Sequence, residues 1–206
     1  MQSPSQQVAR DVGGRLVGAD AELIMASLTE PARFGAIFDR HAPYIQRYLA
    51  RRLGQQIADD LVAETFLAAF RRRASYDARH TDARPWLYGI ATNLIGQHRR
   101  DEVRRLRLNQ VAHQADTSAG HADRVAEQVT AQAMRGPLAT AIGGLAAPDR
   151  DVLLLIAWEQ LTYDEVATAL AIPVGTVRSR LNRARRKVRA VLRELDPTLT
   201  FPEVLT

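Results

Sequence analysis

Basic side chains gather on one predicted helix near the C-terminus of the chain, between Pro173 and Leu195. This segment has eight basic residues against Glu194 alone, a net charge of +7, whereas the whole chain carries +5. The eight are Arg178, Arg180, Arg183, Arg185, Arg186, Lys187, Arg189 and Arg193. An arginine can bridge O6 and N7 of guanine, and an asparagine can pair with adenine. The pattern predicts a helix that contacts DNA.

The residues before this helix carry the signals of a helix-turn-helix. Thr162 and Glu165 form a predicted capping box that opens a short helix, and the residues 171–173 predict a brief turn. The basic helix then has a predicted buried stripe of Val177, Leu181, Ala184, Val188 and Val191. Its predicted DNA contacts are Thr176, Arg178, Ser179, Asn182, Arg183 and Arg186. The alternative is an ordinary helical hairpin whose basic face is only solvated.

The composition agrees with a nucleic-acid partner and excludes several other classes. The chain has 206 residues, of which 46% are hydrophobic and 25% charged, and its pI is about 10.2. All basic residues except Lys187 are arginine, which suits phosphate binding but also follows from a GC-rich genome. The absence of cysteine excludes disulfides, zinc fingers and a thiol nucleophile. No signal sequence or membrane span is apparent, so we expect a soluble, cytoplasmic protein.

Helical periodicity dominates the chain, which predicts an all-α fold of two small helical domains joined by a flexible linker. We expect a flexible tail over residues 1–20, a first domain over 21–107, a linker over 108–135, a second domain over 136–195 and a tail over 196–206. In the first domain, Thr29 is predicted to cap a helix that Gly54 ends, and Pro85 opens a long helix. With only residues 196–206 after the second domain, we expect no large C-terminal regulatory domain.

Two sets of motifs in this order resemble a known family. Leu161-Thr-Tyr-Asp-Glu-Val-Ala and Pro173-Val-Gly-Thr-Val-Arg-Ser-Arg resemble region 4 of the extracytoplasmic-function (ECF) sigma factors, a branch of the sigma-70 family. Asp59-Asp-Leu-Val-Ala-Glu-Thr-Phe66 resembles region 2.2, and Trp86-Leu-Tyr-Gly-Ile-Ala-Thr-Asn93 resembles regions 2.3 and 2.4. The resemblance implies a protein that binds core RNA polymerase, recognises a promoter and promotes strand opening.

The region 2.2 motif implies the residues that meet the polymerase. The resemblance places Asp60, Leu61, Glu64 and Thr65 against the coiled coil of the β′ clamp. The residues themselves agree in part, because an acidic patch on a basic protein suits a basic protein partner. The alternative is that these acids only complement the N-terminal end of their helix.

The region 2.3 and 2.4 motifs imply contacts with the minus-ten element, where the family holds a flipped base of the non-template strand. The residues placed there are Tyr76, His80, Asn93, Gln97, Arg100 and Arg104. Asn93 and Gln97 share a helix face and can hydrogen-bond an unstacked base, while Tyr76 and His80 could stack on one. The arginines would contact phosphates. The alternatives are a buried amide at Asn93 and, for Trp86, a core aromatic. The family commonly has Asp where this chain has Gln97.

Other functions fit the sequence less well. An autonomous helix-turn-helix transcriptional regulator is the main alternative, but the first 135 residues lack the strand–helix alternation of a receiver domain. The five histidines are scattered without metal-ligand spacing, so we expect no enzyme activity, no metal and no cofactor. The expected partners are the β and β′ subunits of core RNA polymerase and promoter DNA, with an anti-sigma factor as a further candidate. We expect a monomer when the chain is free, and no membrane insertion.

Overall fold

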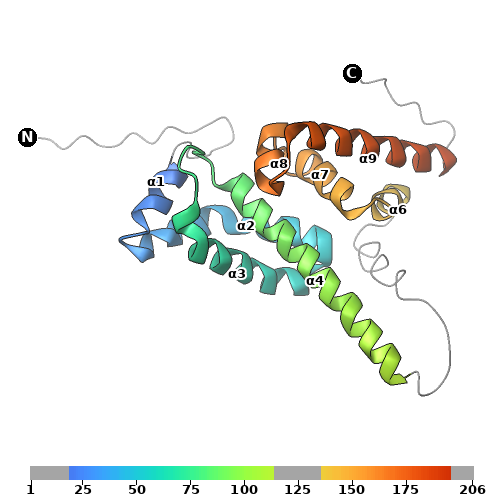
Figure 1. Cartoon of the computed structure of the whole chain (residues 1–206), viewed down its shortest axis with the longest axis horizontal. Helices are drawn as coiled ribbons and strands as arrows, with labels where there is room; N and C mark the ends of the chain where they lie inside the picture. The colour runs from blue at the N-terminus through green and yellow to red at the C-terminus, as the bar shows by residue number, and fades with distance from the viewer. Residues whose placement is uncertain (1–18, 114–135, 196–206) are drawn as a thin grey trace, which may run out of the picture.

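A computed structural model describes residues 19–113 and 136–195, and every regular element in these two ranges is a helix (Figure 1). The predicted all-α fold is confirmed. The two predicted tails lie almost wholly outside these ranges, as does most of the predicted linker. We refer below to residues 19–113 as the N-terminal half and to residues 136–195 as the C-terminal half.

The N-terminal half is built on a helical hairpin and one long helix. It contains α1 (Ala19–Ala26), a 3₁₀ turn η1 (Pro31–Phe34), α2 (Gly35–Leu53), α3 (Gln55–Arg72), a 3₁₀ turn η2 (Arg73–Ser75) and α4 (Arg84–His113). Gly54 alone joins α2 to α3, and its φ of 88° lies in the region that favours glycine. Buried side chains of α2, α3 and α4, among them Ile45, Leu61 and Leu87, form the core between these helices.

Two predicted boundaries in this half are wrong. Thr29 does not cap a helix; its hydroxyl donates to the Ala26 carbonyl, and a 3₁₀ turn begins at Pro31 with no side-chain cap. Proline at the first position supplies the helical φ without needing that cap. The long helix α4 also continues to His113, past the predicted boundary at residue 107. The first residues of the predicted linker, 108–113, are therefore helical.

The C-terminal half contains the predicted helix-turn-helix. Its helices are α6 (Pro137–Gly143), α7 (Ala147–Ala157), α8 (Tyr163–Leu170) and α9 (Val174–Leu195). The capping box is present, because the Glu165 amide donates to the Thr162 hydroxyl over 3.3 Å and the Thr162 amide donates to the Glu165 carboxylate over 2.7 Å. Ala171 ends α8 in the left-handed region, with φ of 50°. The turn thereby redirects the chain into α9.

The two halves pack against each other, with α8 lying on α4 (Figure 1). One continuous core runs from Ile24 in α1 to Leu181 in α9. A Cβ atom at Gly89 of α4 would overlap the carbonyl oxygen of Ala169 in α8, so only glycine permits this close approach. The sequence predicts two domains on a tether; it did not predict that they share a core.

Candidate nucleic-acid interface

The basic face of α9 is exposed because the opposite face is buried. Of the predicted stripe, Val177, Leu181 and Ala184 are buried where α9 packs against α6, α7 and α8, whereas Val188 and Val191 are only half-buried. The residues predicted to contact DNA then point outward: Arg178, Ser179, Asn182, Arg183 and Arg186 are exposed, and Thr176 is half-buried. All six therefore lie at or near one accessible surface of the second helix of the helix-turn-helix.

Two members of this set are already engaged within the protein. The Ser179 hydroxyl donates to the Thr176 carbonyl over 3.0 Å. The Arg183 guanidinium donates to the buried Asp149 carboxylate over 3.3 Å, which links α9 to the start of α7. Arg183 remains half exposed, so the ion pair fixes the direction of its side chain rather than removing it from the surface.

A second polar surface follows α4. Asn93, Gln97, Arg100 and Arg104 are exposed and recur at spacings that place them along one side of the helix. The interpretation of Asn93 as a buried amide is therefore excluded in this structure. Arg104 lies 4.0 Å from Asp101, a contact between two exposed groups that contributes little to stability.

The loop before α4 presents one of its two predicted base-stacking residues. His80 is exposed, but Tyr76 is buried against Trp86, with ring centroids 5.0 Å apart. The Tyr76 hydroxyl donates to the His80 carbonyl, which holds the loop in place. Burial, with further contributions from Asp20, Asp82 and Asp77, raises the pKa of Tyr76 well above its usual value. Tyr76 therefore supports the loop, and Trp86, which the sequence suggested as a core aromatic, is half-buried and packs against the edge of the core.

The predicted polymerase-binding motif divides between surface and core. Asp60 and Glu64 are exposed on α3, whereas Leu61 and Thr65 are buried. The Thr65 hydroxyl donates to the Leu61 carbonyl over 2.6 Å, so its hydrogen-bonding capacity is used within the helix. Neighbouring Asp59 accepts hydrogen bonds from Gln46 and Gln55. Of the four predicted residues, only Asp60 and Glu64 therefore present their side chains to a partner in this conformation.

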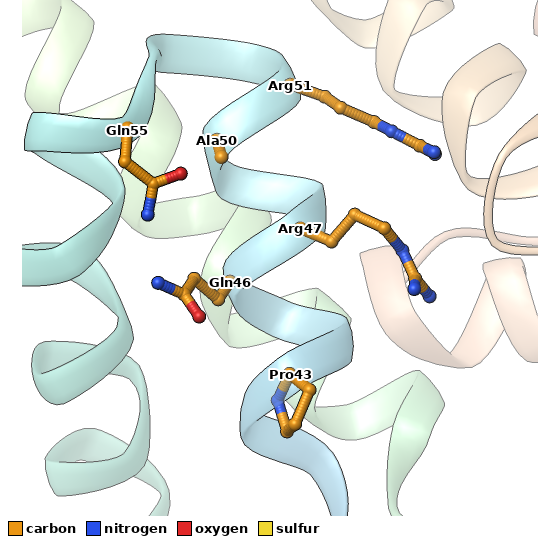
Figure 2. A pocket seen from close by; sticks show the side chains of 6 residues that line it. All are labelled: Pro43, Gln46, Arg47, Ala50, Arg51 and Gln55. Carbon is orange, nitrogen blue, oxygen red and sulfur yellow. The ribbon is translucent and has the colours of Figure 1, made fainter.

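A further arginine surface, which the sequence analysis did not single out, lies on α2. An open hollow of about 490 Å³ is lined by Pro43, Gln46, Arg47, Ala50, Arg51 and Gln55. Figure 2 shows Arg47 and Arg51 extending from α2 away from α3, toward the helices of the C-terminal half. The Arg51 guanidinium lies over the Trp158 ring, 5.5 Å from its centroid. The spacing of four residues between these arginines is the sequence signal that could have identified them.

The C-terminal half also has an apolar groove. Its walls come from α6, α7 and α9, it encloses about 270 Å³, and Leu138, Leu153, Trp158 and Leu192 contribute to its lining. Arg185 and Arg189 border it. An apolar hollow on a basic helix suits a protein segment better than it suits a nucleic-acid backbone.

One group of metal-ligating residues occurs in the described ranges, formed by Asp20, His41 and Asp82. Its central carboxylate is already used. Asp20 accepts hydrogen bonds from Arg40, from His41 over 2.8 Å and from the Ala83 amide over 2.9 Å. These contacts join α1, α2 and the start of α4, so the group has a structural role.

Comparison with known proteins identifies the family. The family model described as sigma-70 region 2 matches residues 37–105, and that described as sigma-70, region 4 matches residues 135–188. The chain is 33% identical over 174 residues to the ECF RNA polymerase sigma factor SigL of Mycobacterium tuberculosis, covering 84% of this chain and 96% of SigL. The chain belongs to the ECF sigma factors. It is also 32% identical to the RNA polymerase sigma factor CarQ of Myxococcus xanthus, covering 79% of this chain and 91% of CarQ.

Solved structures agree on the fold of this sigma factor. CnrH in complex with the cytosolic domain of CnrY is 25% identical, with a TM-score of 0.59, and the match covers 86% of this chain and 99% of that chain. The sigma factor RpoE, solved with the anti-sigma factor NepR from Bartonella quintana, is 21% identical with a TM-score of 0.57, covering 80% and 99% of the two chains. The presence of region 2 also argues against an autonomous helix-turn-helix regulator, which needs no such region.

As an ECF sigma factor, the protein acts in transcription initiation with core RNA polymerase and promoter DNA. Among residues 19–113 and 136–195, no helix is both long enough and apolar enough to cross a membrane.

Proposed function

We propose that the two exposed polar surfaces divide promoter recognition between them. In this proposal, the domain over residues 21–107 binds core polymerase and the minus-ten element, and the domain over 136–195 reads the minus-thirty-five element. The observation that carries the proposal is that Asn93 and Gln97 on α4, and Arg178 and Asn182 on α9, are all exposed on helices. Run-off transcription with purified core polymerase and a library of upstream sequences tests it; transcription that is independent of the added chain would contradict it.

The proposal assigns two kinds of DNA contact to α9, one with base edges and one with phosphates. Arg178 lies in the first turns of α9, where side chains reach base edges, and Arg186 lies two turns later. Arg178→Ala is expected to cost about 1–3 kcal/mol of binding free energy and to relax base preference in the upstream element only. Arg186→Ala should instead weaken binding to all sequences alike and reduce its salt dependence. Promoter-library transcription and salt titrations compare the two; equal loss of base preference in both variants would contradict the assignment.

Asn93 is proposed to hold an unstacked base of the minus-ten element. Asn93→Ala should therefore leave binding to closed duplex promoter nearly intact and should impair opening, because this contact forms only after a base is flipped. Permanganate footprinting of the holoenzyme on the promoter measures strand opening. A pre-melted template should restore part of the transcription by Asn93→Ala, because it bypasses the opening step. If Asn93→Ala loses duplex binding as strongly as Arg178→Ala, the two surfaces are not divided as proposed.

Asp60 and Glu64 are proposed to contact the β′ subunit, since they are the exposed members of the four residues predicted for this contact. Replacing both with arginine should weaken association with core polymerase by about tenfold or more, because like charges would face each other. Analytical ultracentrifugation or native gel shift of the chain with core polymerase measures the loss. The matched control replaces exposed Asp39 and Glu22 with arginine, and an equal loss in the control would remove Asp60 and Glu64 from the interface.

An anti-sigma factor is a candidate partner, because CnrH and RpoE were each solved with another protein and RpoE with an anti-sigma factor. The site of action is proposed to be the cytoplasm and the role to be non-enzymatic, as binding to polymerase and DNA requires neither export nor catalysis. The linker is proposed to set the separation of the two domains, as an under-length tether cannot span two sites.

A further inference from the structure

A buried arginine holds the two halves together at one carboxylate. Arg52, in the last turn of α2, is 1% exposed, and its guanidinium donates to the Asp151 carboxylate of α7 over 2.7 Å. It also donates to the Tyr48 hydroxyl over 2.8 Å. Its Nε atom is buried and has no hydrogen-bond partner among the described residues. Arg52 therefore has donor capacity that Asp151 does not use.

The surroundings of Asp151 are strongly positive. Arg99 donates weakly to the Arg52 carbonyl over 3.5 Å, and Arg150 lies close by in α7. Burial, with the charges of Arg52 and Arg150, lowers the pKa of Arg99 to about 10. Arg52 and Arg99 thus lie in contact beside one carboxylate, and the charge of Arg150 acts on Arg99 from α7. A pair of arginines with an unfilled donor is the arrangement that proteins use for phosphate, because the guanidinium fork matches two phosphate oxygens.

This cluster adjoins the surface assigned to the minus-ten element. The Tyr48 hydroxyl that Arg52 contacts also shares a hydrogen bond of 2.9 Å with Thr92, the residue before Asn93. Arg99 follows Gln97 by two residues on α4. A strand whose base is held at Asn93 must continue past this helix, so its next phosphates have to be held close to it.

The packed arrangement cannot read a whole promoter. Packed helices have axes about 8–10 Å apart, so α4 and α9, which both pack on α8, lie no more than about 20 Å apart there. Elements centred about 25 base pairs apart on B-DNA are separated by about 85 Å, at about 3.4 Å per base pair. The halves must separate for both to be read. Separation removes Asp151 from Arg52 and exposes the cluster.

We propose that Arg52 and Arg99 form a phosphate-binding site for the unstacked promoter strand, and that Asp151 occupies this site while the two halves are packed together. The proposal rests on the proposed function of α4. Glu159 adds to the same contact from the C-terminal half: it accepts a hydrogen bond from Tyr88, and its carbonyl accepts one from Arg84 over 2.9 Å. The ion pair of Asp151 with Arg52 is thus the contact that nucleic acid would have to replace, and the Glu159 contacts help to hold the halves in the packed state.

The test measures binding of the full chain to a short, fluorescein-labelled single-stranded DNA of mixed sequence by fluorescence anisotropy. Asp151→Asn should bind about tenfold more tightly than the natural chain, because the apparent affinity rises with the fraction of chain whose site is free. Gly89→Ala should give a similar gain without any change in charge, because a methyl group there overlaps Ala169. The same methyl group favours the helical state of α4, so the N-terminal half should still fold.

Two further variants make the test specific. Asp164→Asn removes an exposed acid of α8 and changes the net charge equally, so it should alter affinity less than about twofold. Adding Arg52→Gln to Asp151→Asn should abolish the gain, with circular dichroism confirming that the variant is folded. A gain that persists without Arg52, or no gain in Asp151→Asn, would overturn the proposal.

Two other outcomes have distinct meanings. If Asp151→Asn binds core polymerase more tightly but DNA no better, Arg52 serves a protein contact and the phosphate site is wrong. If Asp151→Asn gives no gain while Asn93→Ala still impairs promoter opening, the phosphate site fails and the proposed function stands. The absence of any run-off transcription with core polymerase would instead contradict the proposed function.

Discussion

Replacing Arg150 with methionine is expected to lower the free energy of unfolding of the chain by about 3 kcal/mol or more. Arg150 is buried and donates to three backbone carbonyls at the end of α6: Ile142 over 3.0 Å, Leu145 over 2.7 Å, and Gly143. The last carbonyls of a helix have no partner within it, so these bonds stabilise the end of α6. Without the guanidinium, buried acceptors are left unsatisfied, at about 1–3 kcal/mol for each.

Chemical denaturation of the full chain, followed by circular dichroism, measures the loss. Arg186→Met is the matched control, since Arg186 is exposed on α9 and its replacement should change stability by less than about 0.5 kcal/mol. A loss at position 150 no larger than that of the control would mean that water replaces the guanidinium without penalty. Arg150→Lys should recover only part of the stability, because one ammonium group cannot reach three carbonyls in the same geometry.

Asp20→Asn is expected to lower the free energy of unfolding of the chain by about 3 kcal/mol, since removing one partner from a buried charged group leaves the others uncompensated. The Asp20 carboxylate joins Arg40 and His41 of α2 to the amide of Ala83 before α4. An amide at this position has only one acceptor oxygen and carries no charge. Thermal unfolding compares it with Glu22→Gln, an exposed acid on the same helix, which should have little effect.

The same carboxylate predicts a dependence of stability on pH. Burial alone would raise the pKa of Asp20, but the hydrogen bond and charge of His41, the Ala83 amide and Arg40 together hold it below its ordinary value of 3.8. Because the pKa is lower in the folded chain, Asp20 contributes fully to the free energy of unfolding at pH values above its ordinary pKa. This contribution is lost as the pH falls through the pKa of the folded chain. The natural chain should therefore lose stability below about pH 4 more steeply than Asp20→Asn does. If the free energies of unfolding of the natural chain and of Asp20→Asn fall equally as the pH is lowered, Asp20 does not cause this effect.

Local features of the fold could be predicted from the sequence because neighbouring residues determine them. The capping box at Thr162 and Glu165, the start of α9 and its buried stripe all depend on short spacings. The burial of Leu61 and Thr65 was also within reach, since they recur with Ala58 and Ala69 on one face of α3. A family motif gives residue identities but not which side of the helix faces a partner.

The contact between the halves could not be predicted in this way. From the sequence alone, Gly89 in α4 is only a residue of low helix propensity. The structure shows that Ala169 lies against it, which explains why glycine is needed there. Arg52 and Asp151 are separated by 99 residues of the sequence, and nothing near either residue indicates the other. The roles of Arg47, Arg51 and Arg52 could not be predicted for the same reason. Arginines in a chain so rich in arginine look alike until the structure shows that Arg52 is buried and that Arg51 lies over the Trp158 ring.

The continuous core has a consequence for how the free chain unfolds. Because Val152 and Leu155 of α7 share one cluster with Leu87 and Tyr88 of α4, loss of either half exposes apolar surface of the other. The free chain should therefore melt in a single cooperative transition, although two family regions meet in it. A ligand that binds only the separated halves must offset the free energy of their contact, and once it is bound the two halves unfold independently. Calorimetry of Gly89→Ala should then resolve two transitions. The number of transitions therefore reports whether the two halves are packed together or separated, and separation is the state that can bind both promoter elements.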